Sequence, residues 1–249
     1  MIKNIIFNLK SSKYFKIIIF SSFFIIFNSF YNFYRYGYFN LYILNKAFAS
    51  VGFILLGIVI LLGPSSRLFS FSDPYLKYRK EIGIVSFFLA IFHVIVSLFF
   101  LQENFPIVLF LNRPNLAFIF GLLASLLLTF IFFISNKKAI NYLGHQNWWK
   151  IQYKGVRIAF LLVFFHSIFR KSVDWLSWYR LYNFDVHVKR PFLPDFGLLV
   201  WWFMVFVILI RIFEYISPKL GRIAFYTTAV IVPIIYVITF FWGLIFRYF

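Results

Sequence analysis

The sequence predicts an all-α fold, a polytopic transmembrane helical bundle in which residues 1–249 form a single transmembrane domain. Hydrophobic residues make up 63% of the chain and the mean hydropathy is +0.86, whereas a soluble domain is about half apolar. Apolar runs close to the roughly 20 residues that cross a bilayer recur along the whole length. The connections between the runs are short except for 170–195, so no room is left for a soluble cofactor domain.

About seven spans are predicted, as a six-span core and one further span. The first span follows a basic lead and lacks a small-residue cleavage site of the A-x-A kind, so we expect it to stay uncleaved. In chain order, the spans are expected at 15–34, 46–63, 81–101, 115–135, 150–169, 196–216 and 224–246.

Lysine and arginine residues gather at the ends of these spans and give the chain a net charge of +18. Such cations anchor to lipid headgroups and set the topology, so membrane lipid rather than nucleic acid is the expected partner. Thirteen of them lie in the N-terminal lead and the even-numbered loops, and nine lie on the opposite side. We therefore expect a multi-pass protein of a bacterial cell (inner) membrane, with a cytoplasmic N-terminus and an outer C-terminus.

Two classes of chemistry are excluded by missing residues. The chain has no cysteine, which excludes disulfides, thiolate metal sites and cysteine nucleophiles. The last predicted span has no lysine, which excludes a retinal Schiff base there.

Two of the four histidines lie inside predicted spans, where ionisable residues are rare and usually face the interior of the bundle. The third span begins at residue 81, 12 residues before His93, and the fifth begins at residue 150, 16 residues before His166. These offsets correspond to roughly 18 Å and 24 Å from the cytoplasmic ends of the helices. Both imidazoles therefore fall in the outer half of the membrane, at depths close enough for one ligand to bridge them.

Each of these histidines shares a helix face with small side chains. At 100° per residue, these are Ser86, Ala90 and Ser97 beside His93, and Gly155 and Ala159 beside His166. Small residues allow helices to pack closely, and they equally leave space for a flat macrocycle between two helices. Both interpretations are open at this point.

Each histidine taken alone could be a hydrogen-bonded structural residue. Taken together, two neutral imidazoles on facing helices suit the axial positions of a b-type haem. Zinc is the weaker alternative, because no third or fourth ligand occurs at that depth. Arg170, one turn above His166, could pair with a haem propionate or extend its charge to the headgroups.

Four sequence motifs stand in an order that resembles a known family. LLGPSSRLF (61–69) closes the second span, and YRKEIGIVSFFLAIFH (78–93) joins a basic pair to the first deep histidine. The other two are NRPNLAFIFGLLASLLLTFIFFISN (112–136) and NYLGHQNWWKIQYKGVRIAFLLVFFH (141–166). Over about residues 45 to 170 they resemble the ferric-reductase-like transmembrane domain. Within that family they look most like the haem-binding membrane subunits of the MsrQ (YedZ) type. Those subunits serve periplasmic methionine sulfoxide reductase systems.

The resemblance implies that His93 and His166 are the metal ligands, as the outer axial pair of a b-type haem, within a core of about 45–216. NADPH oxidases and ferric reductases of the family carry a second histidine pair thirteen or fourteen residues nearer the cytoplasm. This chain has Arg79 and Tyr153 at those positions, so one haem is expected. Tyr153 is then either a phenolate ligand or an interfacial anchor.

The expected function is that of an electron-transfer component of an oxidoreductase system, with no catalytic side chain of its own. Its donor would be a quinol or a flavin reductase, which makes a quinone or FMN the second cofactor, and its acceptor an extracytoplasmic redox protein. The basic loop 77–80 could bind a flavin phosphate or only fix the topology. The alternative is a non-redox membrane anchor or assembly subunit that keeps the fold, and few acidic residues in the spans argue against a transporter.

The chain departs from the family pattern after residue 170, where the outer loop is longer and a seventh span follows. An interfacial segment is expected in this loop from its aromatic residues, Trp175, Trp178, Tyr179 and Tyr182. His187 in the same loop and His145 in a cytoplasmic loop are not expected to bind haem.

Overall fold

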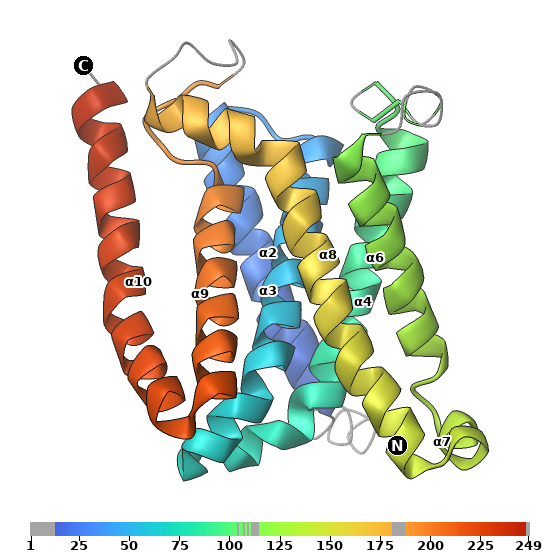
Figure 1. Cartoon of the computed structure of the whole chain (residues 1–249). Coiled ribbons are helices and arrows are strands. Elements are labelled where there is room, and N and C mark those ends of the chain that lie inside the picture. The colour runs from blue at the N-terminus through green and yellow to red at the C-terminus, as the bar shows by residue number, and fades with distance from the viewer. Residues whose placement is uncertain are drawn as a thin grey trace, which may run out of the picture. The chain divides into compact units, whose positions relative to one another are not determined.

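Helices account for all the regular structure in the computed structural model, which describes residues 13–103, 105–106, 108, 110, 115–180 and 188–247 (Figure 1). The expected all-α class is therefore confirmed for this part of the chain. The helices are α2 (Lys13–Tyr36), α3 (Leu41–Leu68), η1 (Ser70–Tyr78), α4 (Arg79–Ile95), η2 (Val96–Phe100), α6 (Leu116–Phe133), α7 (Lys137–Leu143), α8 (His145–Tyr179), α9 (Phe196–Ile216) and α10 (Pro218–Arg247).

Helix starts are set by short polar side chains that accept a hydrogen bond from a backbone N–H of the first turn. These caps are Asn40 before α3, Asn115 before α6, Asn136 before α7 and Asp195 before α9. Between α2 and α3 the chain turns at Gly37, whose φ of +81° favours glycine. Three of the long apolar helices, α3, α6 and α9, thus have a capped beginning, which fixes the level of their side chains.

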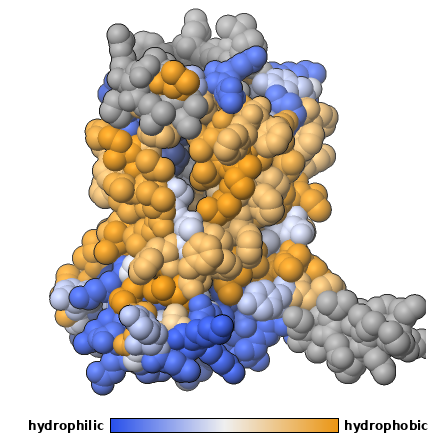
Figure 2. All heavy atoms as spheres, turned by 90° about the vertical axis from the view of Figure 1, so that its right-hand side faces the viewer, coloured by the Kyte–Doolittle hydropathy of each residue, from blue (hydrophilic) through white to orange (hydrophobic). Residues whose placement is uncertain are grey.

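Six helical segments of the described chain are long and apolar enough to cross a membrane, which makes this a multi-pass membrane protein. They are Lys13–Tyr36, Leu41–Leu68, Ser70–Phe100, Leu116–Phe133, Phe196–Ile216 and Pro218–Phe246. On the face drawn in Figure 2, hydrophobic residues cover a broad middle region and hydrophilic residues gather toward its ends. Six of the predicted spans therefore have a counterpart.

The fifth predicted span, 150–169, is the exception, because it forms part of α8, which is not among the six. At 35 residues, α8 is about 52 Å long and could cross a bilayer by length alone. Charged residues along it lower its hydropathy: Lys150, Lys154, Arg157, Arg170, Lys171 and Asp174. The prediction of about seven spans is thus matched by six.

The outer loop also begins later than predicted, since α8 continues to Tyr179. Trp175 and Trp178 are buried in the structure, with exposures of 7% and 5%, and the interfacial placement of this segment stays a prediction. Tyr182 and His187 lie outside the described residues.

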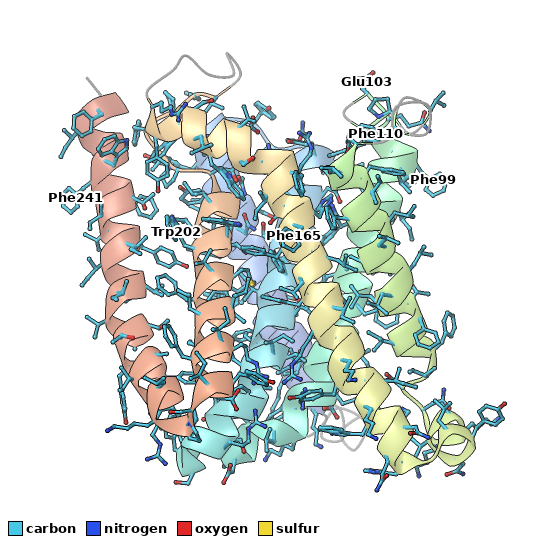
Figure 3. All side chains as sticks on the ribbon, in the orientation of Figure 1. Phe99, Glu103, Phe110, Phe165, Trp202 and Phe241 are labelled. Carbon is cyan, nitrogen blue, oxygen red and sulfur yellow. The ribbon has the colours of Figure 1, made fainter. Side chains whose placement is uncertain are left out.

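The chain divides into two compact units, of which the first comprises Met1–Leu89 and Phe184–Phe249. In this first unit, α3 packs against α2 and α9, and α9 packs against α10. Gly57 of α3 lets α9 approach closely, because a Cβ atom there would lie 3.0 Å from Sδ of Met204. Trp202, labelled in Figure 3, lies on this same helix α9.

The second unit, Ala90–Asn183, is built on α6 and α8, which pack together along their lengths. Trp148 Nε1 donates to the Ile134 carbonyl over 2.8 Å, and Gln152 Nε2 donates to Ser135 Oγ over 2.8 Å. These bonds join the end of α6 to the second turn of α8, and α7 lies between the two helices in the chain. The second unit contains both His93 and His166.

Candidate functional site

His166 is held by a backbone group of the neighbouring helix. Its Nδ1 atom lies 2.7 Å from the carbonyl oxygen of Ala117, in the first turn of α6. A carbonyl oxygen can only accept, so Nδ1 carries the proton and donates. In a neutral imidazole the other nitrogen, Nε2, then keeps its lone pair, which is the state a metal ligand needs.

Gly121 of α6 makes this contact possible. The Ala117 carbonyl lies one helical turn before Gly121, so a side chain on residue 121 would project into the imidazole. A Cβ atom built there would lie 2.7 Å from Nδ1 and 3.0 Å from Cε1 of His166. Sequence reasoning missed both Ala117 and Gly121. The signal was a lone glycine in the apolar run LAFIFGLLASLL, which is open to several explanations.

The small residues that share a face with His166 serve close packing of α8 on α6. Gly155 is buried, and a Cβ atom there would lie 2.9 Å from Cδ1 of Ile131. Ala159 is fully buried on the same face. Of the two interpretations that the sequence left open, helix packing therefore holds at Gly155, where Ile131 fills the space.

Aromatic rings of α6 and α8 pack against one another near His166. Phe165, which directly precedes it and is labelled in Figure 3, has its ring centroid 5.5 Å from that of Phe120 on α6. Phe169, one turn further along the same face of α8, stacks on the same Phe120 ring with centroids 5.4 Å apart. The α6–α8 contact around the imidazole is therefore apolar apart from the Ala117 carbonyl.

His93 lies near the end of α4, two residues before the regular helix ends at Ile95. A π-helical turn, Val96–Phe100, follows directly. Such turns are rare and are often found at functional sites, because they widen the helix and turn its side chains. The chain thus departs from α-helical geometry directly after the turn of α4 that carries His93.

Ser86, on the same face of α4 as His93, is buried at 1% exposure and packs on α3. Its Oγ atom donates to the Gly52 carbonyl over 2.7 Å. Here the small residue again provides a close helix contact, two turns before His93. Ser97 is buried as well, at 7% exposure.

Tyr153 has its ring between two neighbours on α8. It stacks on Trp149 with ring centroids 4.6 Å apart, and the Arg157 guanidinium carbon lies 3.2 Å from the ring centroid on the other side. The three residues follow one another at intervals of four along one side of the helix. Such a stack suits an aromatic anchor at a membrane surface.

The other residues considered from the sequence are Arg170, Arg79 and His145. Arg170 is exposed, and its guanidinium carbon lies 5.5 Å from the centre of the Phe105 ring. Arg79 is the first residue of α4 and is half-buried. His145, at the start of α8, is exposed. Within the described ranges, no three His, Asp or Glu side chains form a group that could hold a metal ion.

A comparison with protein families matches residues 48–156 to the ferric reductase like transmembrane component. The matched stretch contains His93, Arg79 and Tyr153, and it ends ten residues before His166. No curated protein matches the chain significantly. The family resemblance of this stretch is thus supported, and nothing in the match points to the MsrQ branch in particular.

Proposed function

We propose that this chain is a membrane electron-transfer protein in which His93 and His166 hold one b-type haem. Similarity to the ferric reductase like transmembrane component over 48–156 suggests electron transfer within the membrane. To this electron-transfer function the proposal adds a haem cofactor, two ligands for it, and a role like that of the MsrQ subunits.

The observation that carries the proposal is the hydrogen bond from His166 Nδ1 to the Ala117 carbonyl. It orients the ring and keeps Nε2 unprotonated, as an orienting bond does for a metal-ligating histidine. Gly121 supports the same arrangement by leaving the imidazole its place against α6. The donor set of two imidazoles, without a third metal-binding side chain, fits a haem better than zinc.

When bound, the haem would supply one-electron chemistry. His93 and His166 would hold the haem, whose role would be to pass electrons rather than to bind a substrate. The chain's own part would be to hold the imidazoles, with the Ala117 carbonyl orienting His166, while Phe120 and Phe165 pack between α6 and α8 at that level.

A quinol inside the bilayer is the favoured electron donor. Arg79 and Tyr153 stand where relatives carry an inner histidine pair, so the inner step of a cytoplasmic route is missing. The remaining distance, on the order of 15 Å along the helix, would slow direct transfer from a cytosolic flavin. The acceptor would be a redox protein on the outer side of the membrane.

The test is reconstitution in vesicles with a reduced quinone in the bilayer and a membrane-impermeant oxidant outside. Wild-type protein should reduce the oxidant, and His166→Ala should not, because it lacks the orienting bond and the ligand. Equal rates for the two proteins would overturn the proposal.

The second candidate function is a non-redox anchor or assembly subunit. The stack of Trp149, Tyr153 and Arg157 favours it, because a packed aromatic anchor occupies the position of the inner ligand. This candidate predicts a stable wild-type protein that binds no haem when purified from haem-replete cells.

A further inference from the structure

A charged cluster in the first unit joins the end of α2, the start of α3 and the start of α9. Among the residues that the structure describes, Asp195 is its only carboxylate. The Oδ2 atom of Asp195 lies 2.7 Å from Nζ of Lys46 and 3.9 Å from NH1 of Arg35. Its Oδ1 atom accepts from the backbone N–H of Gly197, so Asp195 also caps α9.

Positive charge in this cluster exceeds negative charge. Lys189 and Arg190 join Arg35 and Lys46, and no other carboxylate occurs in residues 13–46 or 188–213. Arg190 donates its backbone N–H to the Arg35 carbonyl over 2.9 Å, and its guanidinium carbon lies 3.8 Å from the Tyr34 ring centre. In the described part of these segments, four cations therefore stand against one carboxylate.

The Lys189 side chain reaches the cluster across Gly37. A Cβ atom on Gly37 would lie 2.7 Å from Cδ of Lys189. The aliphatic part of the Lys189 side chain thus lies against the turn that follows α2. The turn residue, Gly37, comes directly after Arg35 and Tyr36 in the chain. Lys189 itself is exposed and can move its ammonium group toward a ligand.

The Arg35 guanidinium is buried, and only some of its N–H groups make hydrogen bonds. Its side chain is only 9% exposed, and its Nε atom donates to the Leu193 carbonyl over 2.9 Å. Among the residues that the structure describes, NH1 and NH2 make no hydrogen bond. The Asp195 carboxylate stands 3.9 Å from NH1, beyond hydrogen-bond distance, so an anion that accepts from NH1 and NH2 would complete the bonding of this buried guanidinium.

Two helix N-termini add partial positive charge to this cluster. α3 begins at Leu41 and α9 begins at Phe196, and both helix starts belong to this cluster. The N-terminus of a helix carries partial positive charge and favours anions. Two of the three N–H groups of Lys46 already donate, one to Asp195 and one to the Tyr36 hydroxyl at 3.0 Å. Arg35 therefore has more N–H groups available for a ligand than Lys46 has.

We propose that this cluster binds the phosphate group of an anionic phospholipid, with Arg35 as the main donor and Lys189 and Arg190 as outer contacts. Phosphate matches the fork of a guanidinium and forms charge-assisted hydrogen bonds with it. The cluster lies at the ends of three segments that can cross a membrane, α2, α3 and α9, and these ends are the level at which lipid headgroups lie. Inorganic phosphate shares the chemistry, and the experiment separates the two sources.

The test is native mass spectrometry of the full chain released from vesicles of phosphatidylcholine with or without phosphatidylglycerol. Wild-type protein should retain one phosphatidylglycerol, and its unfolding temperature in detergent should rise with this lipid but not with inorganic phosphate. Arg35→Gln should weaken retention about tenfold or more. Arg222→Gln, an exposed cation in the first turns of α10, removes the same charge and should bind as wild type does.

Retention by Arg35→Gln equal to that of wild type would overturn the proposal and leave the cluster as a purely structural contact. Stabilisation of wild type by inorganic phosphate to the same degree would overturn the lipid assignment. If Arg35→Gln does not fold, the double variant Lys189→Gln and Arg190→Gln replaces it. That variant should retain the lipid several-fold less, and unchanged retention would again overturn the proposal.

Discussion

The Nδ1 atom of His166 on α8 lies 2.7 Å from the carbonyl oxygen of Ala117 on α6. This contact requires three features of the sequence. A histidine must lie deep in α8, a backbone carbonyl must lie at the same level of α6, and no side chain may stand between them. The carbonyl comes from the first turn of α6, whose start is fixed by the Asn115 cap. The tautomer of His166 therefore depends on where α6 begins.

Gly121→Ala should weaken haem binding although it adds a single methyl group. The added Cβ atom would lie 2.7 Å from Nδ1 of His166, so the imidazole must turn away and lose its bond to Ala117. Loss of an orienting partner lowers metal affinity by about 10–100-fold, which a haem titration of the apoprotein measures.

The matched control is Gly83→Ala on α4, where an added Cβ atom would lie 3.9 Å from Cγ2 of Val59, an ordinary van der Waals contact. It should bind haem as wild type does. If Gly121→Ala folds and keeps wild-type haem affinity, the role given to the Ala117 bond is wrong.

Gly155→Ala should destabilise the packing of α6 on α8 by about 1–3 kcal/mol, because its Cβ atom would lie 2.9 Å from Cδ1 of Ile131. Ile131→Val removes that Cδ1 atom. The double variant should therefore be more stable than the sum of the two single changes predicts, as a double-mutant cycle of unfolding free energies in detergent would reveal. Strict additivity would show that the two side chains do not share this space.

Glu214→Gln should destabilise the protein more than loss of a surface carboxylate does. Glu214 is 12% exposed and lies 2.8 Å from NH1 of Arg211, itself only 16% exposed, and 2.5 Å from NH2 of Arg67. Removing the carboxylate leaves the Arg211 charge half enclosed without its partner, at a cost of about 1–3 kcal/mol.

The comparison variant is Asp174→Asn, whose carboxylate pairs with Lys171 at 2.8 Å but is 54% exposed. An exposed ion pair contributes about 0.2–1 kcal/mol at most. Chemical unfolding in one detergent measures both variants, and a larger effect for Asp174→Asn would contradict this ranking.

Tyr153→Phe should leave the absorption spectrum of the reduced and oxidised haem unchanged. The Phe ring keeps the stack between Trp149 and Arg157, and only the hydroxyl is lost. A shifted ferric spectrum in this variant would instead identify the phenolate as a ligand, because phenolate ligation changes the electronic state of ferric iron.

Most of the fold follows from hydropathy, because apolar runs of bilayer length leave few alternatives to helices. The starts of α3, α6 and α9 also agree with asparagine and aspartate caps that can be read in the sequence. α8 was the difficult case. Its cations interrupt the apolar pattern, so its continuation to Tyr179 depends on packing that hydropathy does not report.

The candidate site was predictable only in part. His93 and His166 stand out because imidazoles are rare inside spans. The Ala117 carbonyl could not be identified, because every residue has one and only the relative position of α6 and α8 selects it. The small residues beside His166 were visible, but the sequence left open whether a ligand or Ile131 would fill their space.

The central claim is that His93 and His166 hold one b-type haem, and haem quantification in purified protein tests it most directly. We expect a dithionite-reduced b-type spectrum with about one haem per chain. That spectrum should be lost in His93→Ala and in His166→Ala and kept in His145→Ala, the exposed histidine at the start of α8. A stably folded, colourless wild-type protein from haem-replete cells would contradict the claim.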